Sequence, residues 1–248
     1  NGFSFYFHCE DDPSVFHFQK TDLSNKLSYS DNIKKLIFDL GFFSHPFKKT
    51  TVIVVTPNFT LIPQSFFDPK LSKEIIDSNF HNISGITLYD YPEDKEYYIL
   101  YNMDEDVHSF LKRHLSNPVF KHHTTSLLKV FNTYSVTENR KKCFLDFHDG
   151  YASVLCYNED KLLTANIFQT SNNADTTYYI ASFWEKLELD QTKDTLFISG
   201  ETDIHLVVTN DLKKLINHVE RVELNPKVSL TKEQKLTLPT NVIASLCE

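Results

Sequence analysis

The residues best suited to chemistry lie at the end of an apolar run in the second half of the chain. The segment Asp146-Phe147-His148-Asp149-Gly150 places an acid near the end of a predicted strand and an Asp-Gly turn directly after it. A carboxylate in this position can hold Mg²⁺ or a water molecule, and the N–H groups of a turn can bind phosphate. Asp146, Asp149 and Gly150 are therefore candidate nucleotide-binding residues.

A second candidate segment follows the next apolar run. Ser199-Gly200-Glu201 ends a strand predicted over residues 195–199 and could open a helix. Gly200 and Glu201 complete the set of candidate cofactor-binding residues. A single Gly is also what ends many strands without any ligand, so both interpretations of this segment stay open.

Several common kinds of site are not supported. The chain has 5 glycines and no GxGxxG or GxxxxGK[ST] pattern, which disfavours the Gly-rich phosphate loops. CxxC and GxSxG motifs are also missing from the sequence. His122-His123 is predicted on a helix, where adjacent side chains point about 100° apart and cannot share one ion. The sequence thus predicts neither a catalytic residue nor a metal site.

Composition narrows the class of protein. The formal net charge of -8 argues against a nucleic-acid-binding surface. No apolar run approaches the roughly 18 residues that span a bilayer, so no membrane segment is expected. Four scattered cysteines are typical of free thiols in a reducing compartment, which predicts a cytoplasmic location.

The two halves of the chain begin alike. Asn1-Gly2 and Asp149-Gly150 each precede an apolar, strand-like run and an acidic turn. Both dipeptides favour two-residue hairpin turns, because the central residues need positive φ. An apolar strand over residues 143–148 leads into the second turn. By analogy, we expect about 7–10 residues forming a strand ahead of Asn1-Gly2.

Similar elements follow in each half. Helices are predicted with Asp31 and Asp175 as caps, and wholly apolar strands over residues 51–56 and 195–199 are predicted to be central in a sheet. Asn117-Pro118 is predicted to open a helix through residue 131, and another helix is expected at about residues 210–221.

Each half therefore follows the order β-β-β-α-β-α, with variations. The predicted fold is a two-lobed α/β protein with mixed sheets. The predicted lobes are residues 1–134, with the first strand missing from the N-terminus, and residues 135–248.

Three short segments and the opening of the chain carry a resemblance to a known family. They are Asn166-Ile167-Phe168-Gln169, Asp175-Thr176-Thr177-Tyr178-Tyr179-Ile180, Leu196-Phe197-Ile198-Ser199-Gly200-Glu201 and Asn1-Gly2-Phe3-Ser4-Phe5. Over essentially its whole length, the chain resembles an uncharacterised Bacteroidetes family of unknown function with an actin-like ATPase fold. The resemblance implies two ribonuclease-H-like units.

The resemblance also implies where nucleotide would bind. Actin-like ATPases hold phosphates on two hairpin turns, one in each half, with an Asp-x-Gly pattern and small hydroxyl residues. This chain departs from that pattern, because the bulky Tyr151 follows Gly150 and Phe3 follows Asn1-Gly2. An aromatic side chain at such a turn hinders close approach of the backbone to phosphate.

Three functional hypotheses remain. The sequence favours a non-catalytic actin-fold protein that binds an unidentified protein partner or acts as a scaffold, with no cofactor. The alternative is an actin-like ATPase that binds Mg-ATP through atypical phosphate loops. The third hypothesis is a ribonuclease-H-like, metal-dependent nuclease, for which only Asp146 is well placed.

Overall fold

The computed structural model describes residues 2–45, 47–81, 83–92, 96–134, 140–200 and 205–248. The chain forms two compact units, residues 1–125 with 228–230 and residues 126–227 with 231–248. Each unit is described by itself.

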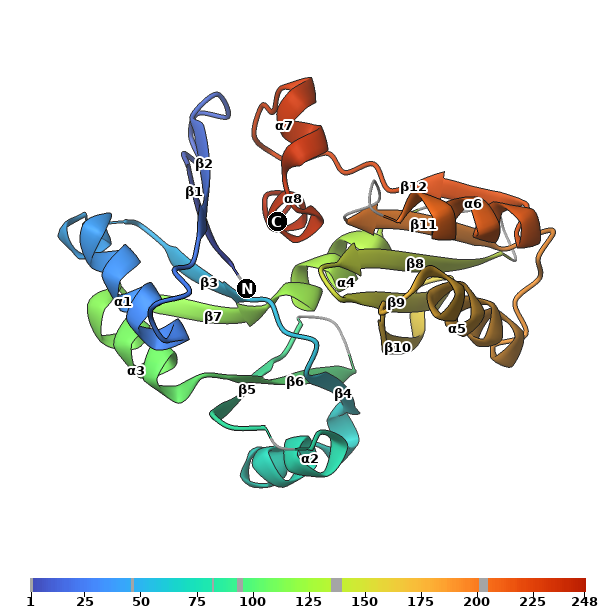
Figure 1. The fold of residues 1–248 in the computed structure, drawn as a ribbon, viewed down its shortest axis with the longest axis horizontal. Coiled ribbons are helices and arrows are strands. Elements are labelled where there is room, and N and C mark those ends of the chain that lie inside the picture. Colours follow the sequence, from blue (N-terminus) through green and yellow to red (C-terminus); the bar gives the residue numbers. More distant parts are fainter. Residues whose placement is uncertain (1, 46, 82, 93–95, 135–139, 201–204) are drawn as a thin grey trace. The chain divides into compact units, whose positions relative to one another are not determined.

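The second unit is built on one mixed sheet. Its strands are β8 (Lys141–His148), β9 (Tyr151–Asn158), β10 (Lys161–Gln169), β11 (Thr195–Gly200) and β12 (His218–Arg221), in the order β10-β9-β8-β11-β12. The first three strands form an antiparallel meander through β8, whereas β11 runs parallel to both β8 and β12. From β8 to helix α6 (Leu206–Leu215) the elements follow the predicted succession β-β-β-α-β-α along the chain, and β12 is an additional strand (Figure 1).

Helices complete the second unit. They are α4 (His123–Asn132), which begins at the end of the first unit, α5 (Asn173–Lys186), α6 (Leu206–Leu215), α7 (Lys232–Thr237) and α8 (Thr240–Ser245). Ile180, Phe183 and Trp184 of α5 pack with alternate residues of β8 and β9 in one apolar core. On the other face of β8, Phe144 stacks on Phe131 of α4 at 4.2 Å between ring centroids. The central strands are therefore buried on both faces.

The first unit divides its strands among smaller sheets. The pairs are β1 (Gly2–His8) with β2 (Phe16–Asp22), antiparallel, and β3 (Thr50–Val54) with β7 (Pro118–His122), parallel. A third sheet has the order β4 (Phe59–Pro63), β6 (Tyr97–Met103), β5 (Ile86–Asp90). The helices are α1 (Tyr29–Asp39), α2 (Ser72–Asn79) and α3 (Glu105–His114), with short 3-10 turns η1 (Phe42–Ser44), η2 (Gln64–Phe66) and η3 (Pro69–Leu71).

Two helix starts differ from the prediction. Ser28 caps α1 and Asn172 caps α5, and their side chains accept hydrogen bonds from the backbone N–H groups of Asp31 and Asp175. The predicted caps therefore lie in the first turn, where acidic residues interact favourably with the helix dipole.

Two predicted helices are wrong in part. Residues 118–122 form β7, because they pair in parallel with β3, and α4 begins only at His123. In the second unit α6 ends at Leu215, and Val219 lies on β12 beside β11. In both places a segment that was predicted to be helical instead pairs with a strand elsewhere in the sequence.

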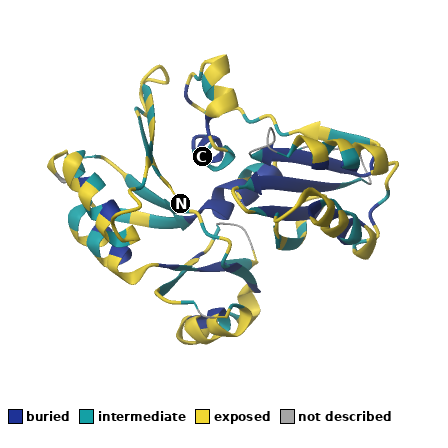
Figure 2. Cartoon of the chain, viewed as in Figure 1, coloured by how far each residue is buried: buried dark blue, intermediate teal, exposed yellow. Residues whose placement is uncertain are grey.

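The apolar strand over residues 51–56 is not central in the described part of the first unit. All five residues of β3 are half-buried, whereas five of the six residues of β11 are buried. Figure 2 shows this contrast, with dark blue strands in the second unit and teal in β3.

Candidate functional site

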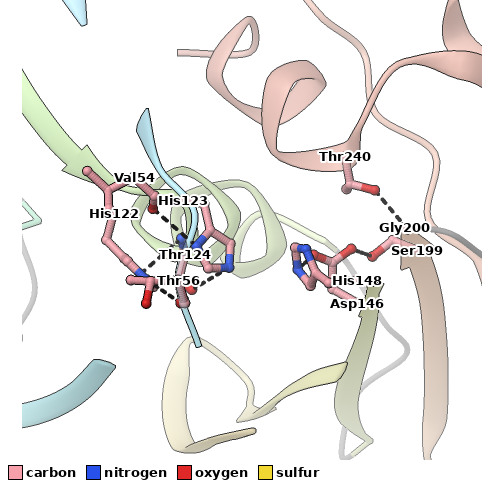
Figure 3. A network of polar contacts seen from close by, with 10 residues as sticks. All are labelled: Val54, Thr56, His122, His123, Thr124, Asp146, His148, Ser199, Gly200 and Thr240. Atoms are coloured by element: carbon pink, nitrogen blue, oxygen red, sulfur yellow. Dashed lines mark hydrogen bonds and ion pairs between the residues drawn. The ribbon is translucent and has the colours of Figure 1, made fainter. Parts of the chain in front are cut away.

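The candidate site of the second unit is organised around Asp146, near the end of β8. Its side chain is 1% exposed. The register of the parallel pair sets Ser199 of β11 beside it, and the Ser199 hydroxyl donates a hydrogen bond of 2.6 Å to Asp146 Oδ1. His148 Nε2 lies 2.8 Å from Asp146 Oδ2. Both carboxylate oxygens therefore have partners within the unit (Figure 3).

The ring of His148 is itself held by an aromatic neighbour. Tyr151, the first residue of β9, stacks on His148 with 4.5 Å between ring centroids. Burial, and then the nearby Asp146 charge, raise the pKa of the Tyr151 phenol, so the phenol stays neutral at physiological pH. The bulky residue at the turn thus supports the His148 ring over the hairpin.

Gly200 ends β11 at a point of close backbone contact. It has φ +80, and a Cβ atom there would lie 2.0 Å from the carbonyl oxygen of Phe147. Its N–H donates a hydrogen bond of 2.8 Å to Thr240 Oγ1, at the start of α8. The requirement for Gly at this position therefore follows from packing of β11 on β8.

The remaining candidates are placed differently. Asp149 and Gly150 form the exposed β8–β9 turn, and a Cβ on Gly150 would meet no atom within 4 Å. Glu201 lies outside the described residues. The structure thus brings Asp146 and Gly200 to neighbouring strand ends, and the role of all five candidates in cofactor binding stays a prediction.

Three further residues belong to this network. His148 shares a strand face with Asp146, because alternate residues of a strand point to the same side, and this spacing is visible in the sequence. Ser199 was recognisable only as part of the strand-ending segment. Thr240 carried no signal, since its contact with Gly200 spans 40 residues of sequence.

A second polar network lies in the first unit, at the carboxyl ends of β3 and β7. Asp90 accepts hydrogen bonds from the His122 N–H at 2.7 Å, the Tyr101 hydroxyl at 3.1 Å and the Thr125 hydroxyl. Asp90 therefore satisfies donors at the start of α4 and beside it. All three groups that donate to the buried Asp90 carboxylate are uncharged.

The sequence predicted that His122 and His123 lie on one helix, and this prediction is wrong. His122 ends β7 and His123 begins α4, and both are buried. His122 Nε2 lies 3.0 Å from the Thr56 carbonyl oxygen, and His123 Nδ1 lies 3.4 Å from that of Val54 (Figure 3). Both rings are thus tied to the segment that leaves β3. Among the residues that the structure describes, no group of three or more His, Cys, Asp or Glu could hold a metal ion.

The Asp90 network makes stability depend on pH. Burial raises the pKa of Asp90 above its ordinary value of 3.8, and the hydrogen bonds from Thr125, His122 and Tyr101 oppose the rise. Between the ordinary pKa of Asp90 in the unfolded chain and its raised pKa in the folded protein, the folded protein binds more protons. The free energy of unfolding therefore falls as pH rises through that window.

We expect Asp90→Asn to remove this fall, because the amide keeps an acceptor but does not titrate. Urea unfolding at a series of pH values above about 4 would measure the slope for both proteins. A slope that is identical in the variant and the wild type would contradict the prediction.

Comparison with known proteins shows which family the chain belongs to. A family model described as "Protein of unknown function (DUF3822)" matches residues 1–219. The chain belongs to this family. No curated protein matches the DUF3822 chain.

Two solved structures resemble this DUF3822 protein. A Bacteroides thetaiotaomicron protein with an actin-like ATPase fold and unknown function is 24% identical, with a TM-score of 0.82, covering 95% of this chain and 91% of that one. The PilM-PilN type IV pilus biogenesis complex contains a chain that is 14% identical, with a TM-score of 0.58, covering 93% and 89%. The DUF3822 protein therefore has the predicted actin-like ATPase fold, which is compatible with nucleotide binding.

None of the helices in the described parts of the chain is long and apolar enough to cross a membrane. The four cysteines are free.

Proposed function

We propose that this DUF3822 protein is a non-catalytic actin-fold protein that binds a protein partner. The observation that carries the proposal is the commitment of the Asp146 carboxylate to Ser199 and His148. A Mg²⁺ ion, or its shell of water, would need those same oxygens. Binding it would therefore first break two buried polar contacts that the unit makes for itself.

Asn1 of the predicted first turn lies outside the described residues, but the start of β1 supports the same proposal. Phe3, directly after Gly2, packs against the apolar core of the first unit. A phosphate-binding turn needs exposed N–H groups and a small side chain there. Phe3 instead contributes to packing.

An aromatic cluster in the first unit offers a surface for a partner. Phe67 stacks on Tyr98 at 3.7 Å between ring centroids, and Tyr91 stacks on Tyr98 at 4.7 Å. Tyr89 and Tyr91 are 47% and 43% exposed. Tyrosines that combine a packed ring with an exposed edge are enriched in protein interfaces. The similar fold in the PilM-PilN complex supports such a use of this scaffold.

The alternative function is binding of Mg-ATP. It is favoured by the place of Asp146, at the carboxyl end of a strand beside a parallel neighbour, where ligands of α/β sheets bind. It requires His148 and Ser199 to release the carboxylate.

A thermal-shift titration with Mg-ATP, Mg-ADP and Mg²⁺ alone separates the two functions. We expect the melting temperature to stay constant up to millimolar nucleotide. A ligand at 100 times its Kd stabilises by about 2.7 kcal/mol, which amounts to a shift of several degrees. A saturable shift of that size would contradict the non-catalytic proposal and support Mg-ATP binding.

The partner is sought by crosslinking and affinity capture with matched variants. Tyr89→Ala/Tyr91→Ala should lose a partner that the wild type retains. Tyr178→Ala is the control, because Tyr178 is 67% exposed on α5. Equal capture by all three proteins would exclude the aromatic cluster as the binding surface.

A further inference from the structure

Strand β10 forms one edge of the five-stranded sheet in the second unit. It pairs with β9 on one side, and among the residues that the structure describes no strand pairs with its other side. Its place at the end of the sheet can be followed in Figure 1. The strand is nine residues long. The backbone N–H and C=O groups along its outer side are therefore a template on which another strand can pair.

The two edges of this sheet differ in the features that discourage such pairing. At the opposite edge, β12 is only four residues long and ends in Glu220 and Arg221. Short length and charge both protect an edge strand. β10 has neither a charged residue nor a proline over residues 162–169. A bulge between Leu162 and Thr164 interrupts the start of β10, and the strand beyond it pairs regularly with β9. Most of the β10 edge is thus unprotected.

The apolar side chains of β10 are also incompletely covered. None of its residues is buried, whereas six of the eight residues of β9 are. Leu163 is 39% exposed. Tyr179 of α5 stacks on Phe168 with 5.8 Å between ring centroids, and Tyr179 is 41% exposed. The edge of β10 therefore offers backbone hydrogen bonds together with apolar contacts, which are the two components of strand addition.

The sequence of β10 indicates which strand would pair there. Outward from Ala165 in both directions, the residues are in turn polar, apolar, apolar and polar. The matching residues are Thr164 with Asn166, Leu163 with Ile167, Leu162 with Phe168 and Lys161 with Gln169. When two identical strands pair antiparallel about a two-fold axis at Ala165, the members of each such couple lie opposite each other. A second copy of β10 would therefore set apolar side chains against apolar ones and polar against polar.

We propose that this DUF3822 protein forms a two-fold dimer in which β10 pairs antiparallel with β10 of a second copy, centred on Ala165. The sheets of the two second units then join into one continuous sheet. The bulge adjoins Leu163, so the pairing is most regular close to the axis, at residues 164–166. The dimer uses residues of the second unit alone, and it is distinct from the aromatic cluster proposed for a protein partner.

Sedimentation equilibrium tests the dimer. We expect the measured mass to rise with protein concentration from 28.9 kDa toward twice that value. Because residue 165 faces its own copy at the axis, Ala165→Glu and Ala165→Lys each place like charges opposite each other. Each variant should weaken the dimer about tenfold or more. An equal mixture of the two variants should restore dimers, since opposite charges then meet.

Leu215→Glu and Leu215→Lys are the matched controls. Leu215 is 42% exposed at the end of α6, so the same charges are added to the same unit away from β10. Both controls should dimerise like the wild type. Three results would overturn the proposal: the mass of a single chain at every concentration, dimers that persist unchanged in both Ala165 variants, or a mixture of those variants that stays monomeric.

If the charged variants do not fold, disulfide crosslinking of Ala165→Cys decides. In the proposed pairing two thiols at residue 165 lie directly opposite, with Cβ atoms about 5 Å apart, whereas two at residue 166 lie diagonally, about 7–8 Å apart. Only the first separation is close to what a disulfide needs. Interchain crosslinking above the wild-type level in Ala165→Cys, but not in Asn166→Cys, supports the dimer. Equal crosslinking in both variants, or in neither, contradicts it.

Discussion

Gly200→Ala is expected to destabilise the protein by about 3–5 kcal/mol. The new methyl group would lie 2.0 Å from the carbonyl oxygen of Phe147 and 2.7 Å from its nitrogen. Both are backbone atoms of the neighbouring strand, so no side-chain rotation relieves the clash. The positive φ of +80 adds a conformational penalty, and overpacking adds a second. Urea unfolding would measure the loss.

Gly150→Ala is the matched control. Gly150 has nearly the same φ, +79, but a Cβ there would meet no atom within 4 Å. Only the conformational penalty applies, so the expected loss is about 1 kcal/mol. Equal losses in the two variants would show that contact with Phe147 does not explain Gly200. A much larger loss in Gly200→Ala than in Gly150→Ala would mean that packing against Phe147 accounts for the glycine at position 200, with no need for a bound nucleotide.

The second unit was the more predictable part of the fold. Its first three strands are long apolar runs separated by Asp149-Gly150 and a second short turn. Both the strand pattern and the turn signals are therefore contained in a short stretch of sequence. Asp146 was recognised as a strand-end acid for the same reason, and it lies there. Its partner Ser199 comes from a parallel strand 53 residues away, and nothing in the local pattern fixes that register.

The errors share a physical cause. Residues 118–122 and 218–221 were predicted as helix but form β7 and β12, which pair in parallel with β3 and β11. Parallel pairing joins segments that are distant in sequence, so the partner that favours the strand is invisible in a short window. The network around Asp90 was missed likewise, because His122 is 32 residues away.

Asp146→Ala is expected to lower the free energy of unfolding by about 2–4 kcal/mol. The substitution leaves the Ser199 hydroxyl and His148 Nε2 without their acceptor at a buried position. Loss of one partner from a buried polar pair costs more than the pair contributes, because the other group remains desolvated. Urea unfolding of the variant would measure the change. Asp149→Ala, in the exposed turn, is the control and should stay within about 0.5 kcal/mol.

A double-mutant cycle with Ser199→Ala makes the prediction specific. If the hydroxyl acts only through Asp146, removing both groups should cost less than the sum of the single losses by about 1 kcal/mol or more. The sign of the Asp146→Ala effect also bears on function. A carboxylate kept for a ligand is commonly held at a cost to stability, so its removal would be neutral or stabilising. A clear loss, coupled to Ser199, means that Asp146 stabilises the fold itself, as the non-catalytic proposal requires.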